Sequence, residues 1–189
     1  MPYAALMMDG AGNLYGTTFS GGLSTTEGVA FKLAPSGSSW TETVLYRFGQ
    51  QGCYYPDPCQ PRAGLIMDEA GNLYGTSGNG YAFRLSPSGT SWMETTLSTV
   101  YYGSDASLIM DAQGHLYGTS TQGSSGHAAG AVFVLVFNGT VWNYTELHSF
   151  CSENSCSDGN LPTAGLITDL AGNLYGTTST VRRQALYPV

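Results

Sequence analysis

The strongest constraint on the fold is a twelve-residue motif that occurs four times in the 189-residue chain. One copy runs from Leu65 to Thr76 and reads Leu-Ile-Met-Asp-Glu-Ala-Gly-Asn-Leu-Tyr-Gly-Thr. The others run from Leu6 to Thr17, from Leu108 to Thr119 and from Leu166 to Thr177, and the third copy has His115 in place of the asparagine. Such internal identity marks a repeated structural unit, which has to be explained before any single residue.

A second block follows the motif in three of the four units. It begins with Phe-x-Leu, has a tryptophan nine residues after the phenylalanine, and has a leucine five residues after the tryptophan. These residues are Phe31, Phe83 and Phe133, then Trp40, Trp92 and Trp142, then Leu45, Leu97 and Leu147. Because both spacings hold three times, the two blocks together define the unit.

Each unit is expected to form four short strands. In the second unit the first strand covers residues 63–67, and the tight turn 68–71 follows, with glycine where a positive φ is needed. Alternating residue character predicts a second strand over 72–76. The third strand ends at the turn signal Pro87-Ser88-Gly89, and the β-forming segment 92–100 supplies the fourth. Hairpin-like connections make the four strands one antiparallel meander.

The spacing between successive units varies, but only in the loops. The turn aspartates of neighbouring units lie 59, 43 and 58 residues apart, and the variation falls between strands two and three and between units. A four-stranded meander of about 43 residues has the size of one propeller blade. We therefore predict an all-β, β-propeller-like fold with three four-stranded antiparallel blades and a two-stranded partial fourth. A β-solenoid, whose coils are typically shorter, and a β-sandwich, which gives no reason for repetition, are the alternatives.

The two motifs also resemble a known family. With Leu-x-x-Asp-x-x-Gly-Asn-Leu-Tyr-Gly-Thr-Thr followed by Val/Ala-Phe-x-Leu-x-Pro-Ser-Gly, the chain resembles the GloVer (Gloeo/Verruco-type) tandem repeat from Ala4 to about Thr178. The resemblance implies an exported bacterial protein of the choice-of-anchor kind, in which a separate C-terminal anchor or sorting signal often follows the repeats. It implies no catalytic residues.

We assign residues 1–178 to a single repeat domain, whose units lie at about 4–62, 63–105, 106–163 and, as a partial unit, 164–178. Residues 179–189 depart from the pattern, because a third strand is expected there and two of the six basic residues occur instead. A truncated or frame-shifted end is our expectation, and a natural capping tail is the alternative. Three and a half blades are fewer than usually close a ring, so we expect an open arc whose exposed edge is prone to association.

The charge of the chain argues against nucleic-acid binding, and its hydropathy argues against a transmembrane helix. The net charge of −7 and the pI of about 4.6 predict an acidic surface, which repels phosphate backbones and disfavours nucleic-acid binding. No apolar run reaches the roughly 20 residues that a transmembrane helix needs. The start of the chain, Met1 to Leu6, has neither the basic segment nor the apolar core of a signal peptide. The protein is therefore expected to be cytosolic or to lack its natural start.

The four cysteines favour the second of these readings. They form two close pairs, Cys53 with Cys59 and Cys151 with Cys156, each in the loop between units, and the unit without cysteines has a shorter loop. Four unrelated buried thiols or a zinc site are the alternatives, but the spacing is not of the CxxC type and has no supporting histidines. We predict two local disulfides, and hence an exported protein, extracellular or at the cell surface, whose signal segment this chain lacks.

The acidic residues that could be taken for catalytic groups or metal ligands recur at equivalent positions of the repeat. Asp9, Asp68, Asp111 and Asp169 recur at one turn position, so we interpret them as caps of that turn rather than as carboxylate ligands. Three glutamates recur on the fourth strand and form no unique acid pair of the kind that glycoside hydrolysis needs: Glu42, Glu94 and Glu146. The three histidines share no metal-ligand spacing: His115, His127 and His148. We predict no catalytic residue, no metal site and no cofactor.

Aromatic residues in the loops between units are the candidate binding groups. Tyr54, Tyr55, Tyr101 and Tyr102 fall where a propeller rim would expose them. Exposed aromatic rings can stack on sugars or anchor a protein partner, and packing over blade edges is the alternative.

The sequence therefore predicts a non-catalytic, exported or cell-surface repeat module. It would bind or display through its variable inter-strand loops, with a glycan or a protein as partner. A propeller-fold enzyme acting on polysaccharide is the alternative. Carboxylates converging at a position where the repeats differ would favour the enzyme, and the sequence shows no such position.

Overall fold

The computed structural model describes residues 4–22, 26–54, 56–101, 106–123, 129–152 and 156–180. These residues form fourteen β-strands and no α-helix, so none of them lies in a helix that is long and apolar enough to cross a membrane. Tyr55, Tyr102, His127 and most of the atypical tail lie outside the described residues.

The strands form four separate antiparallel sheets in chain order. The first sheet contains β1 (Met7–Met8), β2 (Leu14–Thr18), β3 (Val29–Ser36) and β4 (Ser39–Arg47). The second contains β5 (Ile66–Met67), β6 (Leu73–Thr76), β7 (Tyr81–Ser88) and β8 (Ser91–Thr99). The third contains β9 (Ile109–Met110), β10 (Leu116–Ser120), β11 (Ala131–Phe137) and β12 (Trp142–Ser149). The fourth contains only β13 (Ile167–Thr168) and β14 (Leu174–Tyr175).

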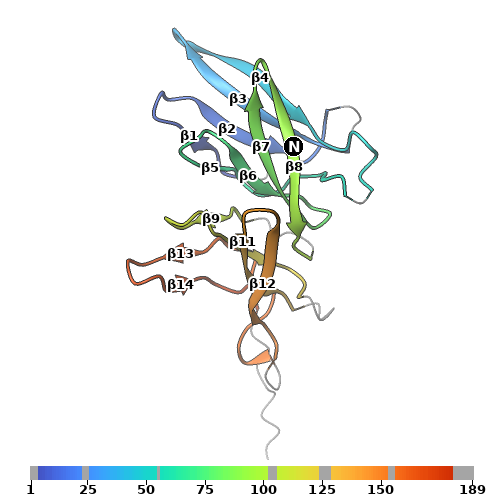
Figure 1. Ribbon diagram of the computed structural model, residues 1–189, viewed down its shortest axis with the longest axis vertical. Coiled ribbons are helices and arrows are strands. Elements are labelled where there is room, and N and C mark those ends of the chain that lie inside the picture. The colour runs from blue at the N-terminus through green and yellow to red at the C-terminus, as the bar shows by residue number, and fades with distance from the viewer. Residues whose placement is uncertain are drawn as a thin grey trace, which may run out of the picture.

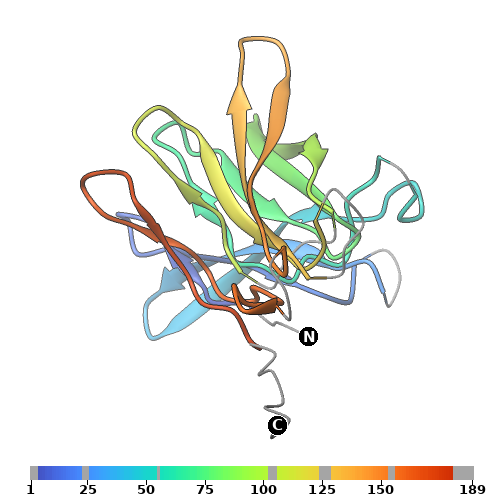
Figure 2. The same cartoon turned by 90° about the horizontal axis from the view of Figure 1, so that it is seen from below.

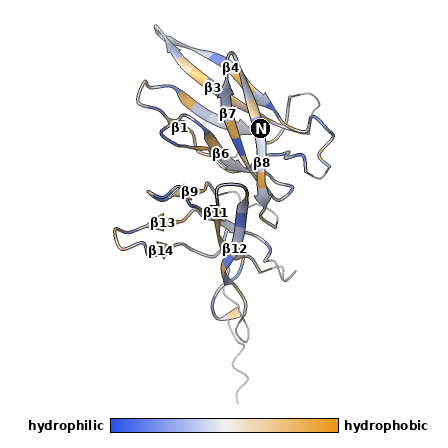
Figure 3. Ribbon diagram, viewed as in Figure 1, coloured by the Kyte–Doolittle hydropathy of each residue, from blue (hydrophilic) through white to orange (hydrophobic). Residues whose placement is uncertain are grey.

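Within each sheet the strands follow one another as a meander. The prediction of an all-β chain with three four-stranded sheets and a two-stranded fourth is confirmed, and the described strands close no barrel. Hydrophobic residues lie along strands such as β3, β7 and β8 (Figure 3). The hairpins that join the first two strands of each sheet all point to the same side of the molecule (Figures 1 and 2).

The first strand of each sheet is shorter than predicted. Residues 63–67 were expected to form a strand, whereas β5 contains only Ile66 and Met67. The reason is that the carbonyl oxygen of Ala63 accepts a hydrogen bond of 3.0 Å from Thr17 Oγ1 of the first sheet. The segment before β5 therefore binds the preceding sheet instead of extending its own.

The glycine of the Leu-Tyr-Gly-Thr motif is required by close packing inside each sheet. In the second sheet Gly75 is paired with Phe83 across β6 and β7, and a Cβ at Gly75 would lie 2.7 Å from Phe83 Cζ and 3.1 Å from Leu65 Cδ2. The first and third sheets repeat this pairing as Gly16 with Phe31 and Gly118 with Phe133. The phenylalanine of each unit thus covers the glycine of the neighbouring strand.

A β-bulge on the fourth strand explains the leucine that follows each tryptophan by five residues. In the second sheet Ala82 pairs with Ser98 and Phe83 pairs with Thr96, so Leu97 is the extra residue. The same shift makes Leu45 and Leu147 the extra residues of β4 and β12. A bulge redirects side chains, and here Leu97 packs into the layer between the second and third sheets.

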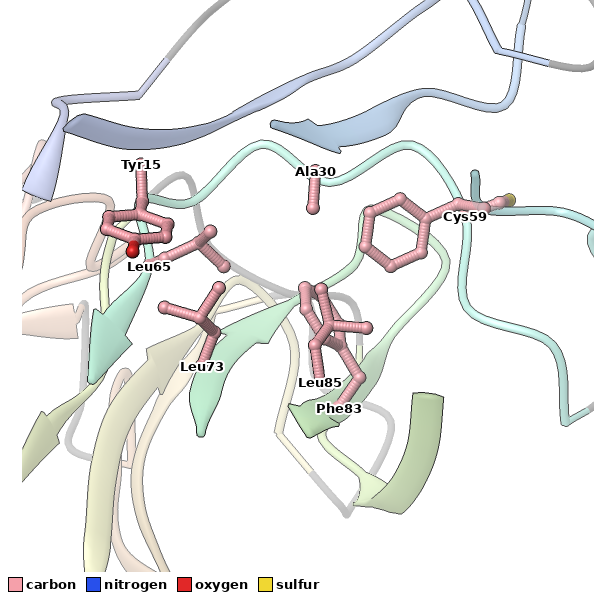
Figure 4. Close-up of a cluster of buried hydrophobic side chains, with 8 residues drawn as sticks. Tyr15, Ala30, Cys59, Leu65, Leu73, Phe83 and Leu85 are labelled. Carbon is pink, nitrogen blue, oxygen red and sulfur yellow. The ribbon is translucent and has the colours of Figure 1, made fainter. Parts of the chain in front are cut away.

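The first three sheets follow one another along the long axis of the molecule and pack against each other through two buried layers (Figure 1). The buried layer between the first two sheets consists of Tyr15, Ala30, Phe48, Cys59, Leu65, Leu73, Phe83 and Leu85 (Figure 4). The layer between the second and third sheets consists of Tyr74, Ala82, Leu97, Val100, Leu108, Leu116, Phe133 and Leu135. The second sheet is therefore covered on both faces.

Candidate functional site

The turn aspartates are fully engaged by their own hairpins. In the first sheet Asp9 Oδ1 accepts hydrogen bonds from the backbone N–H groups of Ala11 and Asn13, both at 2.9 Å. Its Oδ2 accepts bonds from the side chains of Asn13 (2.8 Å) and Tyr15 (3.1 Å). Asp68, Asp111 and Asp169 accept the corresponding bonds from their own hairpins.

This hydrogen bonding stabilises the ionised carboxylate. The bond from the Asn13 side chain is the main cause that lowers the pKa of Asp9 to about 2, and the bond from Asn173 does the same for Asp169. His115 takes the place of the turn asparagine, with its Nδ1 2.8 Å from Asp111 Oδ2. With both oxygens occupied, these carboxylates support the hairpin and have little capacity left for a metal ion. Within the described ranges, no group of three or more acidic, histidine or cysteine residues is arranged to hold a metal.

A disulfide fixes the loop between the first and second sheets, residues 49–61, which we name the stapled loop. It joins Cys53 to Cys59, and Cys59 belongs to the buried layer between the two sheets. The backbone N–H of Cys59 donates to Asn79 Oδ1 (3.1 Å), and Asn79 Nδ2 donates to the carbonyl oxygen of Asp57 (2.9 Å). The Asp57 carboxylate is buried and accepts the backbone N–H of Gln51 at 2.6 Å. The loop is thus held at both ends and from within.

The loop between the third and fourth sheets is built in a similar way. A disulfide joins Cys151 to Cys156, and Asp158 Oδ2 accepts bonds from the backbone N–H (3.1 Å) and hydroxyl (3.0 Å) of Ser152. His148 Nε2 lies 3.7 Å from the same oxygen. Both cysteine pairs are those expected from the sequence, whereas no sequence motif indicated that His148 would lie beside Asp158. The two residues come from a strand and a loop ten positions apart without a recognisable motif.

The loop tyrosines separate into two kinds. Tyr54 extends from the stapled loop with 78% of its surface exposed. Tyr101 is partly exposed, but its ring packs edge-on against Tyr144 with ring centres 5.3 Å apart. Tyr55 and Tyr102 are not among the described residues. Tyr54 is therefore the better binding candidate of the two that can be placed, and Tyr101 serves in packing.

A groove of about 380 Å³ lies between the outer strands β4 and β8, next to the stapled loop. Its walls are formed by Val44, Leu45, Tyr46, Arg47, Gln50, Ser91 and Trp92. Gln50 belongs to the stapled loop and donates from Nε2 to the carbonyl oxygen of Arg47 (3.3 Å). The groove combines two aromatic side chains with hydrogen-bond donors, the combination that suits a sugar or a polar peptide. The sequence did not indicate it, because its walls come from different repeats.

Two partly buried groups at or near this groove, Glu94 and Tyr46, have raised pKa values. Burial raises the pKa of Glu94 to about 7, and the negative charge of Asp57 acts in the same direction against a hydrogen bond from Thr96. Burial also raises the pKa of Tyr46 to about 12, again with Glu94 and Asp57 contributing. Thr96 Oγ1 lies 3.1 Å from Glu94 Oε1 and 2.9 Å from the carbonyl oxygen of Pro56. Glu94 does not line the groove, and the stapled loop comes close to it through the charge of Asp57 and through the bond of Thr96 to Pro56.

A known family matches almost the whole chain. The model of the Gloeobacter/Verrucomicrobia repeat matches residues 1–186, which includes all four sheets and both disulfide loops. The chain belongs to this repeat family. No curated protein is significantly similar to it. In this Gloeobacter/Verrucomicrobia repeat chain the turn hairpins have the same hydrogen bonds in all four sheets, whereas the loops between sheets differ, since two of them carry a disulfide.

Proposed function

We propose that this Gloeobacter/Verrucomicrobia repeat chain is a non-catalytic, exported or cell-surface module that binds a glycan at the stapled loop and the adjoining groove. The observation that carries the proposal is the exposed ring of Tyr54 on a loop that a disulfide and partly buried hydrogen bonds fix in place. The neighbouring groove adds Tyr46 and Trp92. A preorganised aromatic ring loses little conformational entropy when a sugar stacks on it.

Export is supported by the two disulfides. Cys53–Cys59 and Cys151–Cys156 would be reduced in most cytosols, whereas an oxidising compartment preserves them. Both loops owe their shape to these bonds, so the binding surface that we propose depends on the same compartment.

A propeller-like arrangement of the sheets is part of the proposal. The segments before the first strands of three successive sheets approach one another: a Cβ at Gly64 would lie 2.9 Å from the Ala5 carbonyl oxygen and 2.5 Å from Ser107 Oγ. In a propeller the first strands of the blades lie close together around the central axis, and the fourth strands lie farther apart at the outside. This arrangement would place the stapled loop on the outer part of the module, where a ligand has access.

A glycan array tests the binding proposal. We expect wild-type protein to bind a restricted set of glycans, Tyr54→Ala to lose at least ten-fold in affinity, and reductant to weaken binding. Tyr175→Ala is the matched control, because Tyr175 is also an exposed tyrosine but lies on the fourth sheet. Equal binding by wild type and Tyr54→Ala, or no glycan bound at all, would contradict the proposal.

A polysaccharide-cleaving enzyme is the second candidate, and the observation in its favour is Glu94. A carboxyl group with a pKa of about 7 is protonated often enough at neutral pH to act as a general acid. The reaction also needs a second carboxylate across a cleft. Release of reducing ends from a polysaccharide by wild type but not by Glu94→Gln would establish this activity in place of the binding role.

A further inference from the structure

A cavity of about 440 Å³ lies between the third and fourth sheets. Val132, Leu147 and Phe150 line it from the third sheet and the loop after it, and Leu166 and Leu174 line it from the fourth. Polar groups are present at the wall as well, among them the neighbouring side chains of His148 and Asp158. The cavity is therefore mainly apolar and lies where two successive sheets should meet.

The two complete interfaces show what fills this position elsewhere. Phe48 follows β4 and is fully buried, with its ring centre 4.8 Å from that of Phe83 in the next sheet. Val100 holds the corresponding place after β8 and is buried in the layer that contains Phe133. Phe48, Val100 and Phe150 occupy the same position in their units. Each donates its backbone N–H to the carbonyl oxygen of the glycine that precedes the third strand of its own sheet. At the first two interfaces, therefore, the Phe-x-Leu strand of the next sheet covers this residue.

The leucines at the β-bulges, Leu97 and Leu147, also differ in burial between a complete interface and the cavity. Leu97 is 9% exposed because the third sheet covers it, whereas Leu147 is 48% exposed and lines the cavity. The fourth sheet contains only β13 and β14, so the described part of the chain offers no third strand to cover Leu147.

The edge of β14 matches the cavity. The equivalent strands β2, β6 and β10 each pair with a strand on both sides, whereas β13 is the one partner that β14 has among the described strands. Gly176 directly follows β14 at the place of Gly75, and from the part of the chain that the structure describes one atom, Leu166 Cδ2 at 2.8 Å, comes within 4 Å of a Cβ built there. The phenylalanine ring that covers Gly75 has no counterpart over Gly176 among the described residues.

We propose that the open edge of β14 and the adjoining cavity accept an extended strand from another chain of the same repeat type. The strand has the pattern small-Phe-x-Leu, as in Ala82-Phe83-Arg84-Leu85, and pairs antiparallel with β14. Its phenylalanine covers Gly176 and its leucine lies opposite Leu174, in the register that β6 and β7 show. Main-chain hydrogen bonds supply affinity, and the two apolar side chains supply specificity. This site is independent of the proposed glycan surface, which lies between β4 and β8.

The test uses a synthetic peptide of residues 79–100, which contains the β7–β8 hairpin, labelled with a fluorophore and titrated with the full chain. We expect saturable binding by anisotropy, and at least ten-fold weaker binding for a peptide with Phe83→Ala and Leu85→Ala. We also expect slower amide hydrogen exchange at Tyr175 to Thr177 in the complex. The absence of saturable binding, equal binding of the two peptides, or protection confined to other sheets would overturn the proposal.

Two matched protein variants locate the peptide. Leu147→Asp introduces a charge into the cavity wall and should weaken binding at least ten-fold, whereas Leu6→Asp, at an equally exposed leucine on the first sheet, should leave it unchanged. Both leucines are 48% exposed, so the two variants should fold alike. Equal affinities of the two variants would contradict the assignment of the site to the cavity.

Discussion

The second sheet and the two end sheets are built from the same repeat but differ in how much of their surface is covered. Leu65, which begins the motif in the second unit, is 3% exposed, whereas its counterpart Leu6 on the first sheet is 48% exposed. Tyr74 in the second sheet is buried, and Tyr175 in the fourth is exposed. The comparison teaches that the repeat supplies the shape of a sheet, while its neighbours supply most of the burial and hence the stability.

The largest effect is expected from truncating the phenylalanine that covers the glycine. Phe83→Ala removes a fully buried ring that contacts Phe48, and should lower the free energy of unfolding by about 3–5 kcal/mol. Phe31→Ala makes the same change in the first sheet, where the ring is only partly buried, and should cost about half as much. Urea denaturation followed by tryptophan fluorescence measures both. Equal losses would show that neighbouring sheets contribute little.

The motif leucine gives a second pair of variants. Leu65→Ala should cost about 2–4 kcal/mol, because a cavity forms between the first two sheets. Leu6→Ala should cost less than about 1 kcal/mol, since half of that side chain already faces solvent. The urea midpoints of the two variants, compared at a fixed m-value, test the difference, and a larger loss for Leu6→Ala would contradict the account.

The two disulfides should differ although their loops are almost equal in length. Closing a loop of five or six residues stabilises a chain by about 2 kcal/mol in the chain-entropy model. Replacing Cys53 and Cys59 by serine should cost more than this, because Cys59 also packs in the buried layer between two complete sheets. Cys151 and Cys156 border the open end of the molecule. Replacing them by serine should therefore lower the stability only by the contribution of loop closure, about 2 kcal/mol. Thermal denaturation of the two double variants, with reduced wild type as reference, decides between these outcomes.

The smallest expected effect is a pH dependence that belongs to Glu94. Its folded-state pKa of about 7 exceeds the ordinary value of 4.5, so the folded chain holds the proton more tightly than the unfolded chain does. The resulting stability is complete below about pH 4.5 and is lost as the pH rises through 7. Glu94→Gln should flatten the fall in urea midpoint between pH 5 and 8. Glu42→Gln, at the exposed counterpart in the first sheet, should keep the wild-type slope. A flat wild-type profile would contradict this assignment.

Local features of the fold could be predicted from the sequence because they depend on residues of one unit. The Asp-to-Gly turn, the strand order and the pairing of Cys53 with Cys59 all depend on residues close together in the chain. The glycine of each Leu-Tyr-Gly-Thr motif was visible as well, although its partner Phe83 became clear only from the register of β6 and β7.

Features that arise between units were not accessible. The shortening of β5 depends on Thr17 of the preceding sheet, and part of the raised pKa of Glu94 comes from the charge of Asp57 in the stapled loop. The groove between β4 and β8 and the contact of Tyr101 with Tyr144 have the same origin. A single sequence gives the spacing of a repeat but not the angle and separation at which one repeat meets the next.

Native-state hydrogen exchange tests the central claim, that burial between sheets stabilises the repeat and that the ends lack it. Amides of β7 in the second sheet should exchange only by opening reactions with free energies near that of global unfolding. The equivalent amides of β3 in the first sheet should exchange through smaller openings, and the amides of β14 should be the least protected of the three. Equal protection of β3, β7 and β14 would contradict the claim, because it would show that each sheet is stable without its neighbours.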